Sequence, residues 1–225
     1  GNDQGVLYEG TVVDFFPGWS GSFENKLGQD DIGRQKIKQL IRAIRGEDGE
    51  VILSSKAIGR AWVSTDGRHD QRWQKLDFDD SNWRQGQNGA GYEQNSGYQD
   101  WISPEFDFKT EMYNQTNSLY LRFPFAINNL PQIVSKGKLV LKLKYDDGAA
   151  AYLNGHRVAS LNAPPNLNWT SKATASHEAM GFEWVDISAH KDKLRPGKNL
   201  LAIQGLNTGT GSSDMLIVAQ LELNN

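Results

Sequence analysis

Hydrophobic and polar side chains alternate between Lys138 and Tyr145, the most regular pattern in the chain. Leucines and the tyrosine occupy every second position, and lysines occupy most of the positions between them. Because successive side chains of a β-strand point to opposite faces, this pattern predicts a strand with one buried face. Similar alternation predicts strands at residues 119–127, 201–206 and 217–223, and shorter apolar runs predict two more at 51–55 and 61–64.

Turn residues separate these strands. Asn154-Gly155 lies between two apolar runs and supplies the two positive φ angles that a type I′ hairpin needs. A short polar bend, residues 146–148, follows the Lys138–Tyr145 strand. Pro124 cannot donate to a sheet ladder, so it predicts an edge position or a bulge for its strand. Short strands separated by turns predict a mainly β protein, a jelly-roll β-sandwich of roughly eight strands.

The N-terminal part of the chain has a different period. Acidic residues are followed by an apolar stripe at helical spacing, and Gly46 stands where a helix would stop. We expect one N-terminal amphipathic helix, with a basic face that is solvated rather than a phosphate or membrane site. Residues 6–16 predict one strand and its exit turn. We therefore expect residues 1–57 to form a strand and helix packed on a sandwich of residues 58–225. The stripe consists of Ile37, Leu40, Ile41 and Ile44.

Composition narrows the classes of function. The chain has 225 residues, enough to bury a core, and its lack of cysteine excludes thiolate metal sites and thiol nucleophiles. A formal net charge of −3 provides no positive potential for nucleic acid. No apolar stretch approaches the ~20 residues of a membrane helix, so we expect no membrane insertion. The four histidines lack zinc-binding spacing, and the sequence contains neither a nucleophile elbow nor a phosphate-binding loop.

Several motifs together resemble one known family. In order, they are Trp73 with Phe78-Asp79-Asp80-Ser81-Asn82-Trp83, the glycine-rich run 88–92, Tyr120-Leu121-Arg122-Phe123-Pro124-Phe125, the hairpin Tyr145–Val158, and Ser212-Ser213-Asp214. Their order and spacing over residues 58–223 resemble the galactose-binding-domain-like β-sandwich of secreted bacterial proteins. We expect most of these residues to build the fold, with short side chains bonding turn amides and Trp83 anchoring a sheet face.

The resemblance implies a function as well as a fold. Domains of this family usually hold sugars rather than transform them. The implied protein is a non-catalytic carbohydrate-binding module, secreted or at the bacterial cell surface, within a larger polysaccharide-processing or surface protein. Its partner would be a polysaccharide or oligosaccharide. The family often holds one structural calcium ion, for which Asp146 and Asp147 are the candidate ligands, and an ordinary turn is the alternative for these two acids.

A sugar site needs an aromatic plate beside planar polar side chains. The segment from Tyr92 to Trp101 holds three aromatic residues among amides and acids, and its composition indicates a loop rather than a core element. A second candidate loop carries Trp169 between polar residues. For each tryptophan the alternative is a plug that covers one end of the sandwich. We expect ligand contacts from Tyr92, Glu93, Tyr98, Trp101 and Trp169.

Two other functions stay open at this point. The same aromatic loops would also suit a protein partner in an adhesion or scaffolding domain. Carboxylates are also numerous enough for the acid–base pair of a jelly-roll polysaccharide lyase or glycoside hydrolase, which depends on a separation that the sequence does not show. The pool for such a pair is Glu93, Asp100, Glu105, Glu178 and Glu183. We expect binding without turnover.

Overall fold

The computed structural model describes residues 6–8, 11–13, 49–135 and 137–224. The chain divides into two compact units, residues 1–49 and 50–225. In the first unit, β1 (Val6–Tyr8) pairs antiparallel with β2 (Thr11–Val13). The sequence predicted a single strand in this region, and the structure has two short strands that pair with each other. The predicted N-terminal helix lies outside the described residues.

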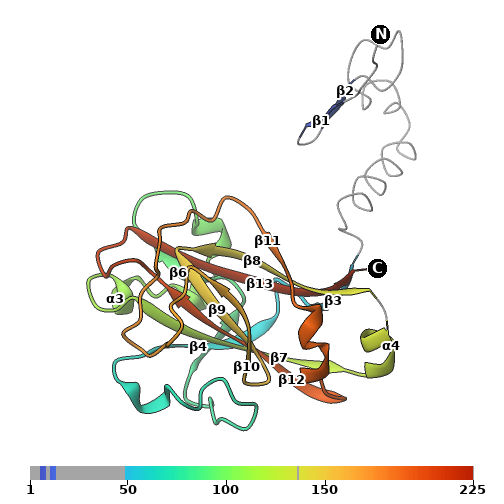
Figure 1. Ribbon diagram of the computed structural model, residues 1–225. Coiled ribbons are helices and arrows are strands. Elements are labelled where there is room, and N and C mark those ends of the chain that lie inside the picture. The colour runs from blue at the N-terminus through green and yellow to red at the C-terminus, as the bar shows by residue number, and fades with distance from the viewer. Residues whose placement is uncertain (1–5, 9–10, 14–48, 136, 225) are drawn as a thin grey trace. The chain divides into compact units, whose positions relative to one another are not determined.

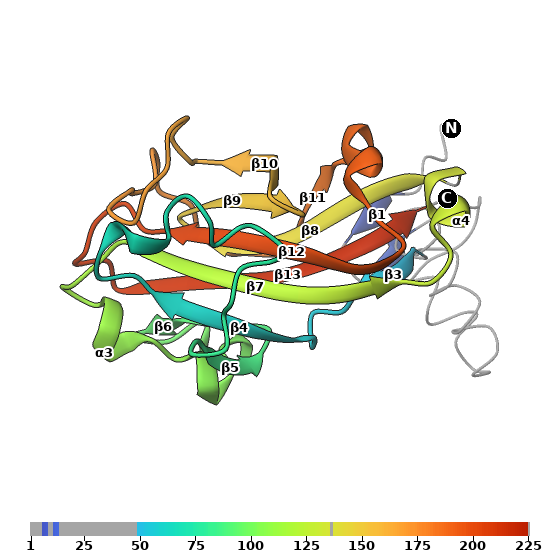
Figure 2. The same cartoon turned by 90° about the horizontal axis from the view of Figure 1, so that it is seen from below.

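The second unit is a sandwich of two antiparallel sheets (Figures 1 and 2). The six-stranded sheet has the order β10-β9-β12-β7-β4-β5. Its strands are β4 (Ile58–Val63), β5 (Arg84–Gln87), β7 (Ser118–Ile127), β9 (Gly148–Leu153), β10 (His156–Leu161) and β12 (Gly197–Leu206). The five-stranded sheet has the order β11-β8-β13-β3, and β6 also pairs with β13. Its strands are β3 (Glu50–Leu53), β6 (Ala90–Glu93), β8 (Lys138–Asp146), β11 (Glu183–Asp186) and β13 (Asp214–Asn224). The predicted mainly β sandwich is confirmed, with more strands than the rough count of eight.

Helices in the described part of the chain are short. They are α3 (Lys109–Met112), α4 (Leu130–Ser135) and 3-10 helices at Gly67–His69, Gln99–Trp101, Pro104–Phe106 and Ser188–Lys193. Among the described residues, no helix has the length and apolar character needed to cross a membrane.

The core lies between the two sheets. On β8, Leu139, Leu141 and Leu143 are completely buried, and they face the buried leucines and phenylalanines of β7. Each such leucine contributes about 1.5–3 kcal/mol relative to an exposed side chain. The intervening lysines of β8 lie on the outer face of the five-stranded sheet. The alternation between Lys138 and Tyr145 therefore predicted correctly which side chains enter the core.

The bend after β8 carries the chain from one sheet to the other. Because β8 belongs to the five-stranded sheet and β9 to the six-stranded sheet, residues 146–148 form a crossover at one end of the sandwich. The next connection is the predicted tight hairpin. Asn154 and Gly155 have φ angles of 50° and 87°, and they join β9 to β10 with Leu153 opposite His156.

Pro124 does not mark an edge strand. Its strand, β7, lies between β12 and β4 in the middle of the six-stranded sheet. The ladder with β4 ends at the pair Arg60–Arg122, so Pro124 lies beyond it and needs no amide hydrogen on that side. The sequence showed that Pro124 has no amide hydrogen to donate. It did not show that the ladder between β4 and β7 ends before Pro124.

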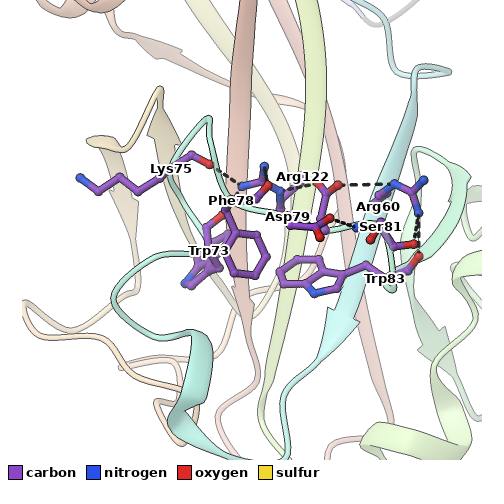
Figure 3. A network of polar contacts seen from close by, with 9 residues as sticks. Arg60, Trp73, Lys75, Phe78, Asp79, Ser81, Trp83 and Arg122 are labelled. Atoms are coloured by element: carbon purple, nitrogen blue, oxygen red, sulfur yellow. Dashed lines mark hydrogen bonds and ion pairs between the residues drawn. The ribbon is translucent and has the colours of Figure 1, made fainter.

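A buried arginine holds the Trp73–Trp83 segment against the outer face of the six-stranded sheet (Figure 3). The Arg122 side chain, on β7, is almost completely buried. The amide of Ser81 donates to Oδ1 of Asp79 at 3.0 Å, and Trp83 is buried on the sheet face. These residues build the fold, as their motif predicted. The guanidinium of Arg122 donates to three carbonyl oxygens and one carboxylate of the segment, those of Trp73, Lys75, Phe78 and Asp80.

Candidate functional site

The loop that follows β6 presents Trp101 on the outer face of the five-stranded sheet. Glu93, at the end of β6, organises this loop, because its two carboxylate oxygens accept hydrogen bonds from the amides of Asn95 at 2.8 Å and Tyr98 at 3.3 Å. The short helix Gln99–Trp101 begins after Tyr98, and the amide of Trp101 donates to the Tyr98 carbonyl at 2.9 Å. Glu93 therefore fixes the conformation of the loop by binding its backbone amides.

Trp101 is exposed, and its neighbours hold it in place. Its side chain is 43% exposed. The ammonium nitrogen of Lys144 lies 4.9 Å from the indole centroid, and the ring of Phe182 packs edge-on at 6.0 Å. Lys144 is buried beneath, where desolvation lowers its pKa. A flat ring fixed in one orientation loses little conformational freedom when a ligand stacks on it.

A cavity of about 320 Å³ opens beside Trp101. It combines the indole with side chains that donate and accept hydrogen bonds, most of them exposed. An aromatic ring next to a few convergent polar groups is the composition expected of a site for a small hydroxylated ligand. The residues that supply these groups are Ser55, Lys56, Gln87, Asp100, Trp101 and Ser103.

Two other residues of the predicted loop are buried. Tyr92 lies on β6, which pairs with β13, and its hydroxyl donates to the Ser212 carbonyl at 2.9 Å inside the sandwich. Burial raises its pKa to about 12. Tyr98 is 8% exposed. Neither ring has a face open to a sugar in this structure, so we place neither tyrosine in the ligand site. The predicted loop therefore begins only after Glu93, because Tyr92 and Glu93 belong to β6.

Trp169 lies on the opposite outer face from Trp101. It is half-buried and packs on an aromatic cluster over the six-stranded sheet that includes Trp73 and Tyr120. The wide cavity of about 670 Å³ along this loop, lined by residues such as Asn168 and Thr170, has no aromatic ring in its lining. The structure therefore does not bring the two predicted tryptophans together, and it packs Trp169 on an outer sheet face rather than over one end of the sandwich.

Three carboxylates converge at the crossover end of β8. Ligand oxygens of Asp146, Glu178 and Asp214 lie within 4.8 Å of one another. The Tyr98 hydroxyl lies 2.9 Å from Asp146 Oδ2 and 3.0 Å from Glu178 Oε2, and it accepts a hydrogen bond from the amide of Ala179. A hydroxyl has a single proton, so it satisfies only one of the two carboxylates at a time.

Burial and mutual repulsion change the acidity of this cluster. Burial, together with the negative charges of Asp214, Asp147 and Glu178, raises the pKa of Asp146 to about 8, against a lowering by the Tyr98 hydrogen bond. Burial and the nearby Glu93 and Glu178 also raise the pKa of Asp214. Carboxylates that repel one another in this way form an oxygen-rich group that could hold a metal ion.

Asp147, the second acid predicted as a metal ligand, points elsewhere. Its Oδ1 accepts from the amide of His177 at 3.0 Å, and its Oδ2 accepts from the amide and hydroxyl of Thr208 at 2.8 and 2.9 Å. The carboxylate thus ties together the loops around the crossover. Asp146 belongs to the acidic cluster, whereas Asp147 links backbone segments that are distant in the sequence.

Sequence reasoning missed the other members of the cluster. Asp214 occurs in the closing segment of the family motif and Glu178 in the pool of carboxylates, but neither was assigned to a metal. They belong to separate segments, and only the pairing of β13 with β8 and the return of the loop before β11 bring them to Asp146. No local signal in the sequence marks this convergence.

The oxygens of the cluster lie close together. Paired carboxylates of glycosidases lie about 5–5.5 Å apart in retaining enzymes and farther apart in inverting ones, so that the sugar and a water molecule fit between them. Here the oxygens lie within 4.8 Å, and Asp146 is 2% exposed. Asp214 is half-buried and Glu178 is exposed, so the cluster is not closed to solvent.

Comparison with known proteins gives a likeness at the level of fold. No protein-family model and no curated protein matches the sequence. Similar solved structures include a calcium-binding mutant of β-glucuronidase 2 from Bacteroides uniformis, with 13% identity and a TM-score of 0.43 over 76% of this chain and 18% of that one. A glycosyl hydrolase family 2 member from Bacteroides cellulosilyticus has 17% identity and a TM-score of 0.43, over 74% and 20% of the two chains.

A β-glucuronidase from an uncultured Clostridium has 10% identity and a TM-score of 0.46, over 79% of this chain and 30% of that one. The chain therefore spans less than a third of the length of these enzymes. At this degree of similarity the comparison concerns the arrangement of strands and carries no information about ligands.

Proposed function

We propose that the chain is a non-catalytic carbohydrate-binding module that holds a polysaccharide or oligosaccharide at the cavity beside Trp101. The observation that supports this most directly is the exposed indole of Trp101, which forms a wall of a cavity with hydrogen-bonding groups around it. We further propose that the module belongs to a larger polysaccharide-processing or surface protein that a bacterium exports, as the sequence resemblance implies.

The chemistry of the cavity fits this ligand class. A pyranose ring has one apolar face, which stacks on an indole, and equatorial hydroxyls, which bind planar polar groups such as those of Gln87 and Asp100. A single ring and a few hydrogen bonds give weak binding. We expect dissociation constants of roughly 10 µM to 1 mM, about −7 to −4 kcal/mol.

The test is a titration of tryptophan fluorescence with soluble xylan, β-glucan, galactan and hyaluronan, with affinity electrophoresis on the same panel. We expect at least one polysaccharide to bind and Trp101→Ala to weaken that binding at least tenfold, which is about 1.4 kcal/mol. Trp169→Ala is the matched control, because it removes a half-buried indole from the opposite face and should leave the affinity unchanged. Equal affinity of wild type and Trp101→Ala would rule out this site.

The same polysaccharides distinguish a module from an enzyme. We expect no new reducing ends and no unsaturated product after prolonged incubation. Turnover that persists in purified protein and disappears in Glu178→Gln would show that the acidic cluster is catalytic, and the proposal of a non-catalytic module would fail.

We also propose that Asp146, Glu178 and Asp214 bind one structural calcium ion. Calcium prefers carboxylate and carbonyl oxygens in irregular loops, and the cluster offers three carboxylates from three segments. A bound cation would offset their mutual repulsion and link β8, β13 and the loop before β11. Its role is to stabilise the fold.

Calcium binding is tested by thermal unfolding at pH 7.5. Calcium at a hundred times its dissociation constant should stabilise the folded protein by about 2.7 kcal/mol relative to EDTA, because it binds the folded state alone. Asp146→Asn should abolish this increment. An equal increment in Asp146→Asn would place the calcium elsewhere.

A further inference from the structure

A second exposed tryptophan shares the outer face of the five-stranded sheet with Trp101. Trp184, on the edge strand β11, is 40% exposed, close to the 43% of Trp101. It was not among the residues that the sequence singled out. Phe182, which packs edge-on against Trp101, lies two residues before Trp184 in the chain.

The strand register fixes where the two indoles stand. Trp184 is paired with Lys142 of β8, and Lys142 is paired with Gln220 of β13, so these three residues form one row across the sheet. Trp101 stands over Lys144, the next outward position of β8. Outward positions of one strand recur about every 6.6–6.8 Å, so the two tryptophans stand over neighbouring positions of the same strand.

Each indole rests on a buried ammonium group. The Lys142 nitrogen lies 4.1 Å from the Trp184 ring centroid, and the Lys144 nitrogen lies 4.9 Å from that of Trp101. Lys142 is held in turn by an ion pair of 2.7 Å with Glu222. Since cation–π contact occupies one face of each ring, the opposite face is the one available to a ligand. Both rings are thus fixed before a ligand arrives.

The groups around the rings favour a sugar chain over a protein surface. The centre of a protein interface is depleted of charged residues. Here the exposed charged side chains of Lys56 and Asp100 line the cavity beside Trp101. The half-buried amide of Gln220 lies in the same row of the sheet as Trp184. Flat apolar faces alternating with hydrogen-bonding groups are the chemistry of linked pyranose rings.

We propose that Trp101 and Trp184 form one platform that binds two or more linked sugar residues, so that the ligand is an internal stretch of a polysaccharide chain and not a single terminal sugar. This inference rests on the proposed function. Trp101 with its cavity holds one sugar, and Trp184 holds a further residue of the same chain. Trp184 therefore determines how binding depends on chain length.

The experiment is isothermal titration calorimetry with xylo-, cello- and galacto-oligosaccharides of one to six residues. For the series that binds, we expect wild-type affinity to rise at least tenfold from disaccharide to hexasaccharide. Trp184→Ala should remove this rise and leave disaccharide affinity within twofold of wild type, and Trp101→Ala should weaken binding at every length. Met180→Ala is the matched control, because it removes an 89% exposed apolar side chain from the adjoining loop and should change nothing.

Folding of each variant is checked by its melting temperature, and Trp184→Leu, which keeps apolar cover without a flat ring, should behave like Trp184→Ala. Hexasaccharide binding by folded Trp184→Ala or Trp184→Leu equal to that of wild type would overturn the platform while the Trp101 site stands. No binding of any length by wild type would overturn the proposed function itself. Self-association of wild type that Trp184→Ala abolishes in sedimentation velocity would show that the face binds a second copy, and the platform would again be wrong.

Discussion

At the scale of the residue, burial decides what each polar or aromatic group does. Tyr92, Tyr98 and Trp101 lie within ten residues of one another, yet only Trp101 offers an open ring face. Asp146 and Asp147 are adjacent, yet one joins a carboxylate cluster and the other binds backbone amides. The sequence identified these residue types as notable, but their roles follow from which neighbours surround each side chain.

The raised pKa of Asp146 predicts how stability depends on pH when calcium is absent. The folded state keeps a proton on Asp146 up to about pH 8, and the unfolded chain releases it near pH 4. The folded state therefore binds more protons in this window, and stability falls as the pH rises from about 4 to 8. Urea unfolding in EDTA measures this decline, and Asp146→Asn should flatten it and stabilise the protein at pH 8 by roughly 1–3 kcal/mol.

Other carboxylates titrate in both proteins, so the difference between wild type and Asp146→Asn is the informative quantity. A difference that stays constant between pH 5 and pH 8 would contradict the raised pKa of Asp146.

At the scale of the element, local sequence determined more of the structure than it did for the roles of single side chains. The alternation in β8 and the Asn154-Gly155 turn were both predicted and both occur, because strand period and turn geometry depend on neighbouring residues. Long-range tertiary contacts add to the turn. The amide of Leu200 donates to Oδ1 of Asn154 at 2.8 Å, and the Asn154 amide group donates to the Lys193 carbonyl at 2.8 Å. The hairpin is thereby anchored to β12.

Gly155→Ala should destabilise the sandwich by roughly 1–2 kcal/mol. Gly155 has a φ of 87°, where a Cβ is unfavourable, and a Cβ there would also lie 3.0 Å from Lys75 Cδ. Gly209→Ala is the control, since a Cβ added at Gly209 would have no neighbouring atom within 4 Å and the substitution should change stability by less than about 0.5 kcal/mol. Chemical unfolding curves measure the stability change of each variant. Equal changes in Gly155→Ala and Gly209→Ala would show that backbone strain at Gly155 does not cause the destabilisation.

At the scale of the whole molecule, the sandwich is assembled by strands distant in sequence. The predicted sandwich began at residue 58, and the compact unit of the structure begins at Glu50. In the five-stranded sheet β3 pairs with β13, with Leu53 opposite Leu221. Leu53 is also part of the core, because its side chain is 3% exposed.

Two shortened chains test this boundary. A chain that begins at Glu50 should unfold in a single cooperative transition. A chain that begins at Ile58 lacks β3 and should be less stable by about 3 kcal/mol or more, because it loses the buried Leu53 side chain and leaves part of β13 unpaired. Calorimetry compares the two, and equal melting temperatures would support the boundary at residue 58.

The sequence by itself determined the fold class, the inward face of β8 and the hairpin after β9, since each depends on the period or conformational preference of adjacent residues. Only the tertiary structure decided that Tyr92 is buried, that Asp146 meets Glu178 and Asp214, and that Trp184 stands beside Trp101. These outcomes depend on strand register and on the crossover between sheets. Both are set by long-range pairing, which no local window of sequence contains.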